Sequence, residues 1–184
     1  ELKNPDLEPA RVALEHRKGY VVLSPRGELE AELPGRLRHE ANLSSELPAV
    51  GDWVAIEAVA GEDKAKIHAV LPRTSKFSRK VAGMDVDEQV VAANVDFAFL
   101  ISALDQDLNL RRIERYLTLA WDSGAQPVVL LTKRDLYEGD LDEALADVRS
   151  VAPGAEVHAL SNVTGEGFEQ LEPYIAGTKT IAVM

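Results

Sequence analysis

The pattern of apolar and polar positions differs between the two halves of this 184-residue chain. In the first half, short stretches alternate between apolar and polar residues and are separated by Gly and Pro, which is typical of strands with one face in water. The alternation predicts five strands, at residues 11–16, 20–23, 28–33, 50–57 and 65–71. Such short, closely spaced strands predict a small antiparallel β-barrel, either oligonucleotide-binding (OB-like) or SH3-like.

In the second half the pattern changes to buried strands and amphipathic helices. Residues 95–101 are almost continuously apolar, which indicates a strand covered on both faces. Asn109 is placed to cap a helix whose apolar stripe is Leu110, Ile113, Leu117 and Trp121. Further strands are predicted at 127–131, 155–160 and 179–183, and further helices at 140–151 and 168–175. This alternation predicts an α/β domain with a doubly wound, mainly parallel sheet.

These patterns divide the chain into a barrel at 1–72, a connection with little periodicity at 73–90, and the α/β domain at 91–184. The charges support the division. Residues 1–80 carry thirteen Lys and Arg against thirteen Asp and Glu, whereas residues 81–184 carry seven against eighteen. We expect Trp53 and Trp121 to be core residues, and the polar segment 35–47 to be a loop.

The net charge of −11 argues against a nucleic-acid partner, but the average hides a basic stretch at 64–80 that contains no acidic residue. A solvated cationic linker would look the same, although an aromatic residue among cations favours RNA contact. The candidate RNA-binding residues are Lys64, Lys66, Arg73, Lys76, Phe77, Arg79 and Lys80, with Arg36 and Arg38 in the polar segment.

Composition excludes several other classes of protein. The chain has no cysteine, so neither disulfides nor thiolate metal sites are possible, and its four histidines are too scattered to suggest metal ligands. No apolar run reaches the roughly 20 residues that span a bilayer, and the first residues lack the order of a signal peptide. We expect a soluble, cytoplasmic monomer without a membrane partner.

Candidate chemistry lies at the end of the apolar strand 128–131. Four polar residues follow it: Thr132, Lys133, Arg134 and Asp135. The Asp135 carboxylate can accept two parallel hydrogen bonds from guanine, from N1–H and from the exocyclic amino group. Adenine cannot make this pair, because its N1 is an acceptor. The Lys133 stem can lie along the base plane while its ammonium stays hydrated.

A second loop follows the next predicted strand and begins with Ser161, Asn162 and Val163. In a guanine-nucleotide fold this loop brings a backbone N–H to the guanine O6, and a small serine lets the turn close. Alone, such a segment would be an ordinary helix N-cap. Two such loops at one edge of a sheet favour a nucleotide site over that alternative.

The two loops, preceded by a small barrel, resemble the ribosome small-subunit-dependent GTPase family, RsgA (YjeQ). The resemblance extends to residues 88–96, 101–103 and 112–117 and covers the chain from Arg11 onward. It implies that Asp135 reads guanine, Lys133 packs on the base and Asn162 donates its N–H to O6. Thr132 stands where many GTPases have asparagine, and its shorter side chain argues against the usual contact to N7.

In that family the GTPase domain is circularly permuted, so the base-recognition loops precede the phosphate loop. No Gly-x-x-x-x-Gly-Lys-Ser/Thr motif occurs in these 184 residues, and no catalytic residue can be named among them. Our hypothesis is that the chain is the front of a longer protein, or a piece that ends just before the phosphate loop. Alone it should neither hydrolyse GTP nor bind it tightly. The motif should follow closely when the gene is read onward from Met184.

By resemblance, the complete protein would bind GTP or GDP with Mg²⁺, associate with the small ribosomal subunit and its rRNA, and hydrolyse GTP late in subunit maturation. Zinc would belong to a C-terminal region that these residues do not include. One alternative is a non-catalytic RNA- or ribosome-binding module whose α/β half is only a scaffold. Another is a doubly wound domain for a flavin-like phosphorylated ligand, which the lack of a phosphate-binding loop disfavours.

Overall fold

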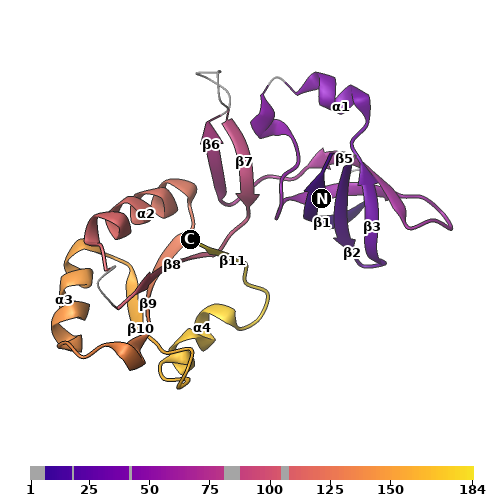
Figure 1. The fold of residues 1–184 in the computed structure, drawn as a ribbon. Coiled ribbons are helices and arrows are strands. Elements are labelled where there is room, and N and C mark those ends of the chain that lie inside the picture. The colour runs from indigo at the N-terminus through magenta and orange to yellow at the C-terminus, as the bar shows by residue number, and fades with distance from the viewer. Residues whose placement is uncertain (1–6, 18, 42, 81–87, 105–107) are drawn as a thin grey trace. The chain divides into compact units, whose positions relative to one another are not determined.

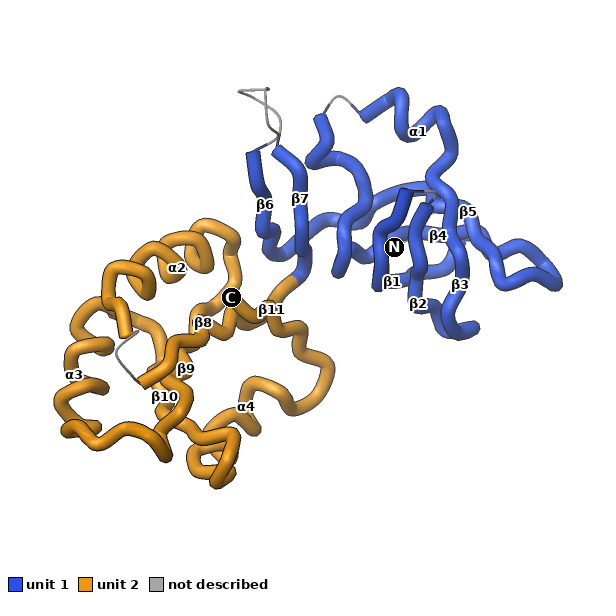
Figure 2. Tube along the Cα trace, in the orientation of Figure 1, with its two compact units in different colours: residues 1–94 blue, residues 95–184 orange. Residues whose placement is uncertain are grey.

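The computed structural model describes residues 7–17, 19–41, 43–80, 88–104 and 108–184. The chain divides into two compact units, unit 1 at residues 1–94 and unit 2 at residues 95–184 (Figure 2). The boundary lies at the end of a strand, between Asn94 and Val95. Each unit has its own hydrophobic core.

Unit 1 is built on a closed five-stranded barrel with the strand order β1-β2-β3-β5-β4 (Figure 1). Its strands are β1 (Glu8–His16), β2 (Gly19–Ser24), β3 (Gly27–Glu32), β4 (Trp53–Ala58) and β5 (Lys64–Val70). Four of the strand pairs are antiparallel, and β3 pairs with β5 in parallel. The five predicted strands are confirmed, and this order is that of an OB barrel rather than an SH3-like barrel.

Alternating residues of these strands fill the barrel interior. Val12, Val22, Val54, Ile56 and Ile67 are all at most 1 % exposed, and they belong to one apolar cluster. The polar residues between them point to the solvent, because successive side chains of a strand point to opposite faces. The sequence pattern predicted this core because each strand has only one face that can be buried.

The polar segment 35–47 contains two short helices where a loop was predicted. They are α1 (Gly35–Glu40) and the 3₁₀ turn η1 (Ser44–Glu46). Pro34 precedes α1, and its carbonyl accepts from Arg38 N (3.2 Å). Leu37 is half-buried and lines a cavity that Ile67 of β5 also lines.

Described residues of the segment predicted to be an aperiodic connection form two paired strands of unit 1, which we call the hairpin. Its strands are β6 (Lys76–Lys80) and β7 (Glu88–Ala93), paired antiparallel. Ala93 N donates to Val50 O (2.9 Å), which attaches the hairpin to the loop before β4. Gly51 has φ +89°, and a Cβ there would lie 2.2 Å from Ala93 O, so only glycine permits this approach. The pattern of apolar and polar residues did not reveal these strands, because most of their residues are exposed and show no clear alternation.

A buried ion pair joins the loop before β4 to the segment after β5. Arg73 donates to both carboxylate oxygens of Asp52, at 2.7 and 2.6 Å, and also to the carbonyls of Ser45 and Leu47. The Asp52 side chain is 0 % exposed and that of Arg73 is 15 % exposed. Asp52 also accepts from Ala49 N (2.8 Å). The Arg73 guanidinium therefore stabilises unit 1 from within.

Unit 2 is a parallel sheet with the strand order β10-β9-β8-β11 (Figure 1). The strands are β8 (Phe97–Ala103), β9 (Gln126–Thr132), β10 (Glu156–Ala159) and β11 (Ile181–Val183). They are joined by α2 (Leu110–Ser123), η2 (Arg134–Leu136), α3 (Leu141–Val151), η3 (Phe168–Leu171) and α4 (Glu172–Ile175). The chain moves from β8 to β10 and then returns to the other side of β8, as in a doubly wound sheet.

The helices of unit 2 cover the two faces of the sheet. Helices α2 and α3 contact each other, and α2 lies against the central strands β8 and β9 whereas α3 lies against the edge strand β10. On the opposite face, η3 and α4 pack through Leu171 and Tyr174. Asn109 caps α2 by accepting from Arg112 N (3.1 Å), as predicted. The helix predicted at 168–175 covers these residues, as a 3₁₀ turn followed by one turn of α-helix.

Both tryptophans lie at the surface, so the prediction that they are core residues was wrong. Trp121 is 47 % exposed, because Ile113, Leu117 and the small Ala120 form the buried stripe of α2. Trp53 is 42 % exposed at the start of β4, where the next residue, Val54, points into the barrel. The sequence pattern misplaced both because size and hydrophobicity alone do not show which side of an element a residue occupies.

We predict that Arg73→Ala destabilises unit 1 by about 3–5 kcal/mol, because it leaves the buried Asp52 carboxylate without its cationic partner. Urea unfolding of the 184-residue chain would measure the change. The exposed hairpin residue Arg79 is the matched control, and Arg79→Ala should change stability by less than about 0.5 kcal/mol. Equal losses for the two variants would contradict the structural role of Arg73.

Candidate functional site

The carboxyl ends of β9 and β10 place the predicted nucleotide residues at one edge of the unit 2 sheet. β9 ends at Thr132, and the next residue, Lys133, has a left-handed backbone with φ +61°. This conformation is uncommon for a residue with a side chain. It turns the chain sharply into η2, which contains Asp135.

The buried hydroxyl of Ser161 connects the two predicted loops. Ser161 is 0 % exposed, and its Oγ donates to Asp135 Oδ1 (2.5 Å). The same oxygen accepts from the backbone N–H groups of Val163 and Thr164, each at 3.1 Å. Ser161 thus orients the carboxylate and shapes the second loop at once. Asp135 itself is exposed.

A backbone hydrogen bond adds a second link between the loops. Arg134 N donates to Leu160 O (3.1 Å), one residue before Ser161. Arg134 also lies 3.9 Å from Glu166 in the second loop, measured from Nε to Oε1. These contacts fix the position of one loop relative to the other.

A cleft of about 620 Å³ opens beside these loops. Five of the six predicted nucleotide residues line one edge of it: the polar Thr132, Lys133, Asp135 and Asn162, and the apolar Val163. Its apolar wall consists of side chains from the strands and η3, among them Phe99, Leu130, Leu160 and Phe168. An apolar cleft with a few convergent polar groups is the usual form of a small-molecule site.

One side of the cleft carries groups of the kinds that can bind a purine base. A carboxylate, a lysine stem and a loop of small residues border an apolar surface large enough for an aromatic ring. The Thr132 hydroxyl lies 3.5 Å from Ser102 O on β8. The structure brings together the six predicted nucleotide residues: Thr132, Lys133, Asp135, Ser161, Asn162 and Val163.

The candidate RNA-binding residues all lie in unit 1 but not on one element. Lys64 and Lys66 are exposed on β5, Arg36 and Arg38 are exposed on α1, and four others lie on β6: Lys76, Phe77, Arg79 and Lys80. The hydrogen bond to Glu62 raises the pKa of Lys64 above its ordinary value. Arg73 differs from the rest, because its guanidinium is engaged with Asp52.

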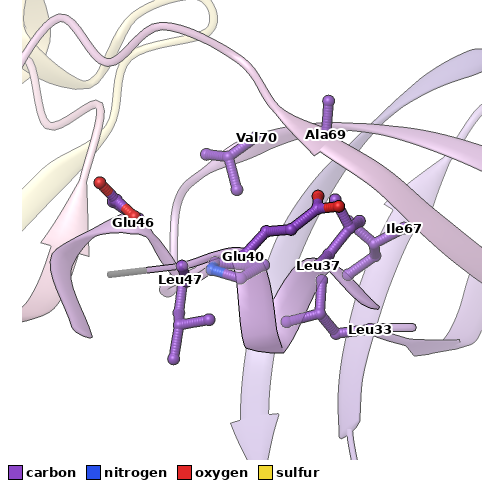
Figure 3. A pocket seen from close by; sticks show the side chains of 10 residues that line it. Leu33, Leu37, Glu40, Glu46, Leu47, Ile67, Ala69 and Val70 are labelled. Carbon is purple, nitrogen blue, oxygen red and sulfur yellow. The ribbon is translucent and has the colours of Figure 1, made fainter. Parts of the chain in front are cut away.

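A second cavity, of about 260 Å³, lies in unit 1 between α1, η1 and β5 (Figure 3). Its wall is mainly aliphatic, with Leu33, Leu37 and Ile67, and the side chains of Glu40 and Glu46 stand near it. Among the described residues, no three His, Asp or Glu side chains are grouped so that they could hold a metal ion. None of the helices in the described part of the chain is long and apolar enough to cross a membrane.

Comparisons with known proteins agree with this architecture. Residues 70–184 match the family model described as RsgA GTPase. The small ribosomal subunit biogenesis GTPase RsgA of Opitutus terrae is 47 % identical over 188 residues, which cover 96 % of this chain and 50 % of the relative. The corresponding RsgA 2 of Lactiplantibacillus plantarum is 41 % identical over 172 residues, covering 94 % and 48 %. The chain spans about half the length of these curated relatives.

Solved structures show the same fold. The crystal structure of YjeQ from Thermotoga maritima superposes with a TM-score of 0.77 at 22 % identity, covering 96 % of this chain and 59 % of that one. YloQ, described as a circularly permuted GTPase, superposes with a TM-score of 0.71 at 18 % identity, covering 100 % and 62 %. With its barrel, its parallel sheet and its matching sequence, the chain belongs to the RsgA GTPase family.

Proposed function

We propose that the cleft at the carboxyl edge of the unit 2 sheet is the guanine-recognition half of a GTPase. The full-length protein binds GTP or GDP, associates with the small ribosomal subunit and its rRNA, and hydrolyses GTP in subunit maturation. The hydrogen bond from Ser161 to Asp135 carries this proposal, because it holds a carboxylate beside the loop that offers backbone N–H groups. The curated relatives, which are named as small ribosomal subunit biogenesis GTPases, support the same reaction.

Each residue of the cleft has a distinct role in this proposal. Asp135 accepts from guanine N1–H and the exocyclic amino group, and Lys133 covers one face of the base. Asn162 donates its backbone N–H to O6. Ser161 is a positioning residue, because it acts through Asp135 and the backbone of the second loop.

Phosphate binding and hydrolysis depend on groups outside these 184 residues in our proposal. A glycine-rich loop of the full-length protein would hold the phosphates, and Mg²⁺ would neutralise their developing charge. Zinc, if bound, belongs to a further region of the full-length protein. We propose that this protein is a cytoplasmic monomer.

The RNA-contacting surface in our proposal is the hairpin of β6 and β7 with the exposed cations of β5 and α1. Lys76 is half-exposed and lies 3.7 Å from Glu88, and Arg79 donates to Gln89 across the hairpin (2.9 Å). These exposed contacts can be exchanged for phosphate contacts at little cost. Arg73 is left out of this surface because its hydrogen bonds lie within unit 1.

We predict that Asp135→Asn in the full-length protein weakens GDP binding by about 1–3 kcal/mol, the scale of a lost bidentate base contact. The amide presents an N–H where guanine also presents one. Xanthine has a carbonyl at that position, so binding of xanthosine diphosphate should improve. Competition binding with the two nucleotides measures both changes. Unchanged preference for guanine in the variant would refute the role of Asp135.

We predict that Ser161→Ala weakens GDP binding by about 1–2 kcal/mol, because Asp135 loses its donor and two backbone N–H groups lose their acceptor. Calorimetric titration of the full-length protein measures the loss. Thr164→Ala is the matched control, since its hydroxyl contacts only Glu166 N in the same loop (3.3 Å) and should have little effect. If both variants bind GDP equally well, Ser161 does not position the site.

We predict that replacing Lys76, Arg79 and Lys80 together by Gln weakens binding to small ribosomal subunits and makes it less sensitive to salt. Each lost phosphate contact should reduce the slope of log K against log salt by about 0.7–0.9. Binding measured between low and physiological salt gives this slope. Arg26→Gln, an exposed cation on the turn between β2 and β3, should leave it unchanged. If the variant binds more weakly by the same factor at every salt concentration, so that the slope is unchanged, phosphate contact by the hairpin is excluded.

A further inference from the structure

An exposed row of side chains crosses three adjacent strands of the barrel. In the strand register, Arg11 on β1 stands opposite Leu23 on β2 and opposite Trp53 on β4. Residues directly opposite each other lie on the same face of a sheet. Leu23 is 51 % exposed and Trp53 is 42 % exposed, and we call these three residues the Trp53 row. It presents an indole and an aliphatic side chain with a cation between them.

The cation of this row is held in place by the backbone of unit 1. Arg11 donates from Nε to Gly51 O (3.2 Å) and from Nη2 to Asn94 O (3.1 Å). Its guanidinium carbon lies 5.5 Å from the centroid of the Trp53 ring. At this distance the cation attracts the ring face, which favours one orientation of the indole. The exposed aromatic surface is therefore preorganised, so less conformational entropy is lost when a ligand contacts it.

The Trp53 row lies next to the base of the basic hairpin. Ala93, the last residue of β7, donates to the carbonyl of Val50, three residues before Trp53. Lys76, the first residue of β6, stands opposite Ala93. Trp53 is the first residue of β4 and lies at one end of the barrel. The cations of β6 begin near this end and extend away from it. An aromatic platform with cations beyond it matches a nucleic-acid strand whose base stacks while its phosphates contact lysine and arginine.

We propose that Trp53 is a stacking platform for one unpaired RNA base, with Arg11 as its positioning residue. The proposal rests on the proposed RNA contact of the hairpin and adds a site for a base to it. An unpaired base is required, because the faces of bases within a duplex are covered by their neighbours. The fixed charge of Arg11 disfavours a purely apolar protein surface as the occupant.

Tryptophan fluorescence tests this proposal directly, because the chain has only two tryptophans, Trp53 and Trp121. The variant Trp121→Phe leaves Trp53 as the only indole, and Trp53→Phe leaves Trp121. Each variant of the 184-residue chain is titrated with a single-stranded RNA of twelve adenosines, and separately with a duplex RNA of the same length. We expect the single strand to quench Trp53 with saturation and to leave Trp121 unchanged. The duplex should not quench Trp53.

Affinity measurements complete the test. Trp53→Ala should weaken binding of the single strand roughly five- to 150-fold, as for the loss of one base stack, whereas Trp53→Phe should retain most of the affinity. Leu14→Ala is the matched control, an equally exposed apolar residue on β1 outside the row, and should change affinity less than twofold.

Three results would overturn the proposal. They are absence of Trp53 quenching by bound RNA, equal quenching by the duplex, and equal effects of the Trp53→Ala and Leu14→Ala substitutions. If RNA still binds in these cases and depends on the hairpin cations, the proposed RNA contact stands without the platform. If the chain binds no RNA at any salt concentration, both proposals fail.

Discussion

Parallel pairing of β9 with β8 and β10 brings the carboxyl ends of these strands to one edge of the sheet, and the candidate base site depends on this arrangement. Ser161 then joins the two loops through a single buried hydroxyl that donates to Asp135 and accepts from two backbone N–H groups. Because the hydroxyl has no exposed surface, water cannot replace these contacts. The carboxylate is therefore oriented before a ligand arrives.

In unit 1, too, polar contacts join segments that are separate in the sequence. The barrel has a large apolar core of its own, whereas the apolar cluster between the hairpin and the loop before β4 is small, formed by Ala49, Val90 and Ala93. The Asp52–Arg73 pair and Asn94 add polar contacts to this region. The Asn94 side-chain amide donates to Gly51 O (3.1 Å) and accepts from Thr74 N (3.0 Å). Such contacts are directional, so they give the exposed hairpin a defined position on the barrel.

The two units differ in their balance of positive and negative residues, which determines how each interacts with a polyanion such as RNA. Unit 1 carries thirteen Lys and Arg against sixteen Asp and Glu, and unit 2 carries seven against fifteen. In unit 1 the cations of β5 and β6 are concentrated in one stretch of sequence, whereas acidic residues are spread over much of unit 2. A protein with this distribution can contact RNA through one unit while repelling it from the other.

The sequence by itself determined the five barrel strands, the parallel sheet and the residues of the candidate base site. The strands produce strong local signals, because a half-buried strand must alternate and a doubly covered strand must be apolar. The site residues have weak signals singly, and they were identified from two polar loops at the ends of neighbouring strands together with the family resemblance. Only the tertiary structure decided that residues 76–80 and 88–93 pair as antiparallel strands, that Arg73 is buried against Asp52, and that Trp53 and Trp121 are exposed. Partners far apart in the chain determine these features, such as Asp52 for Arg73 and Arg11 for Trp53, and no local period records such pairs.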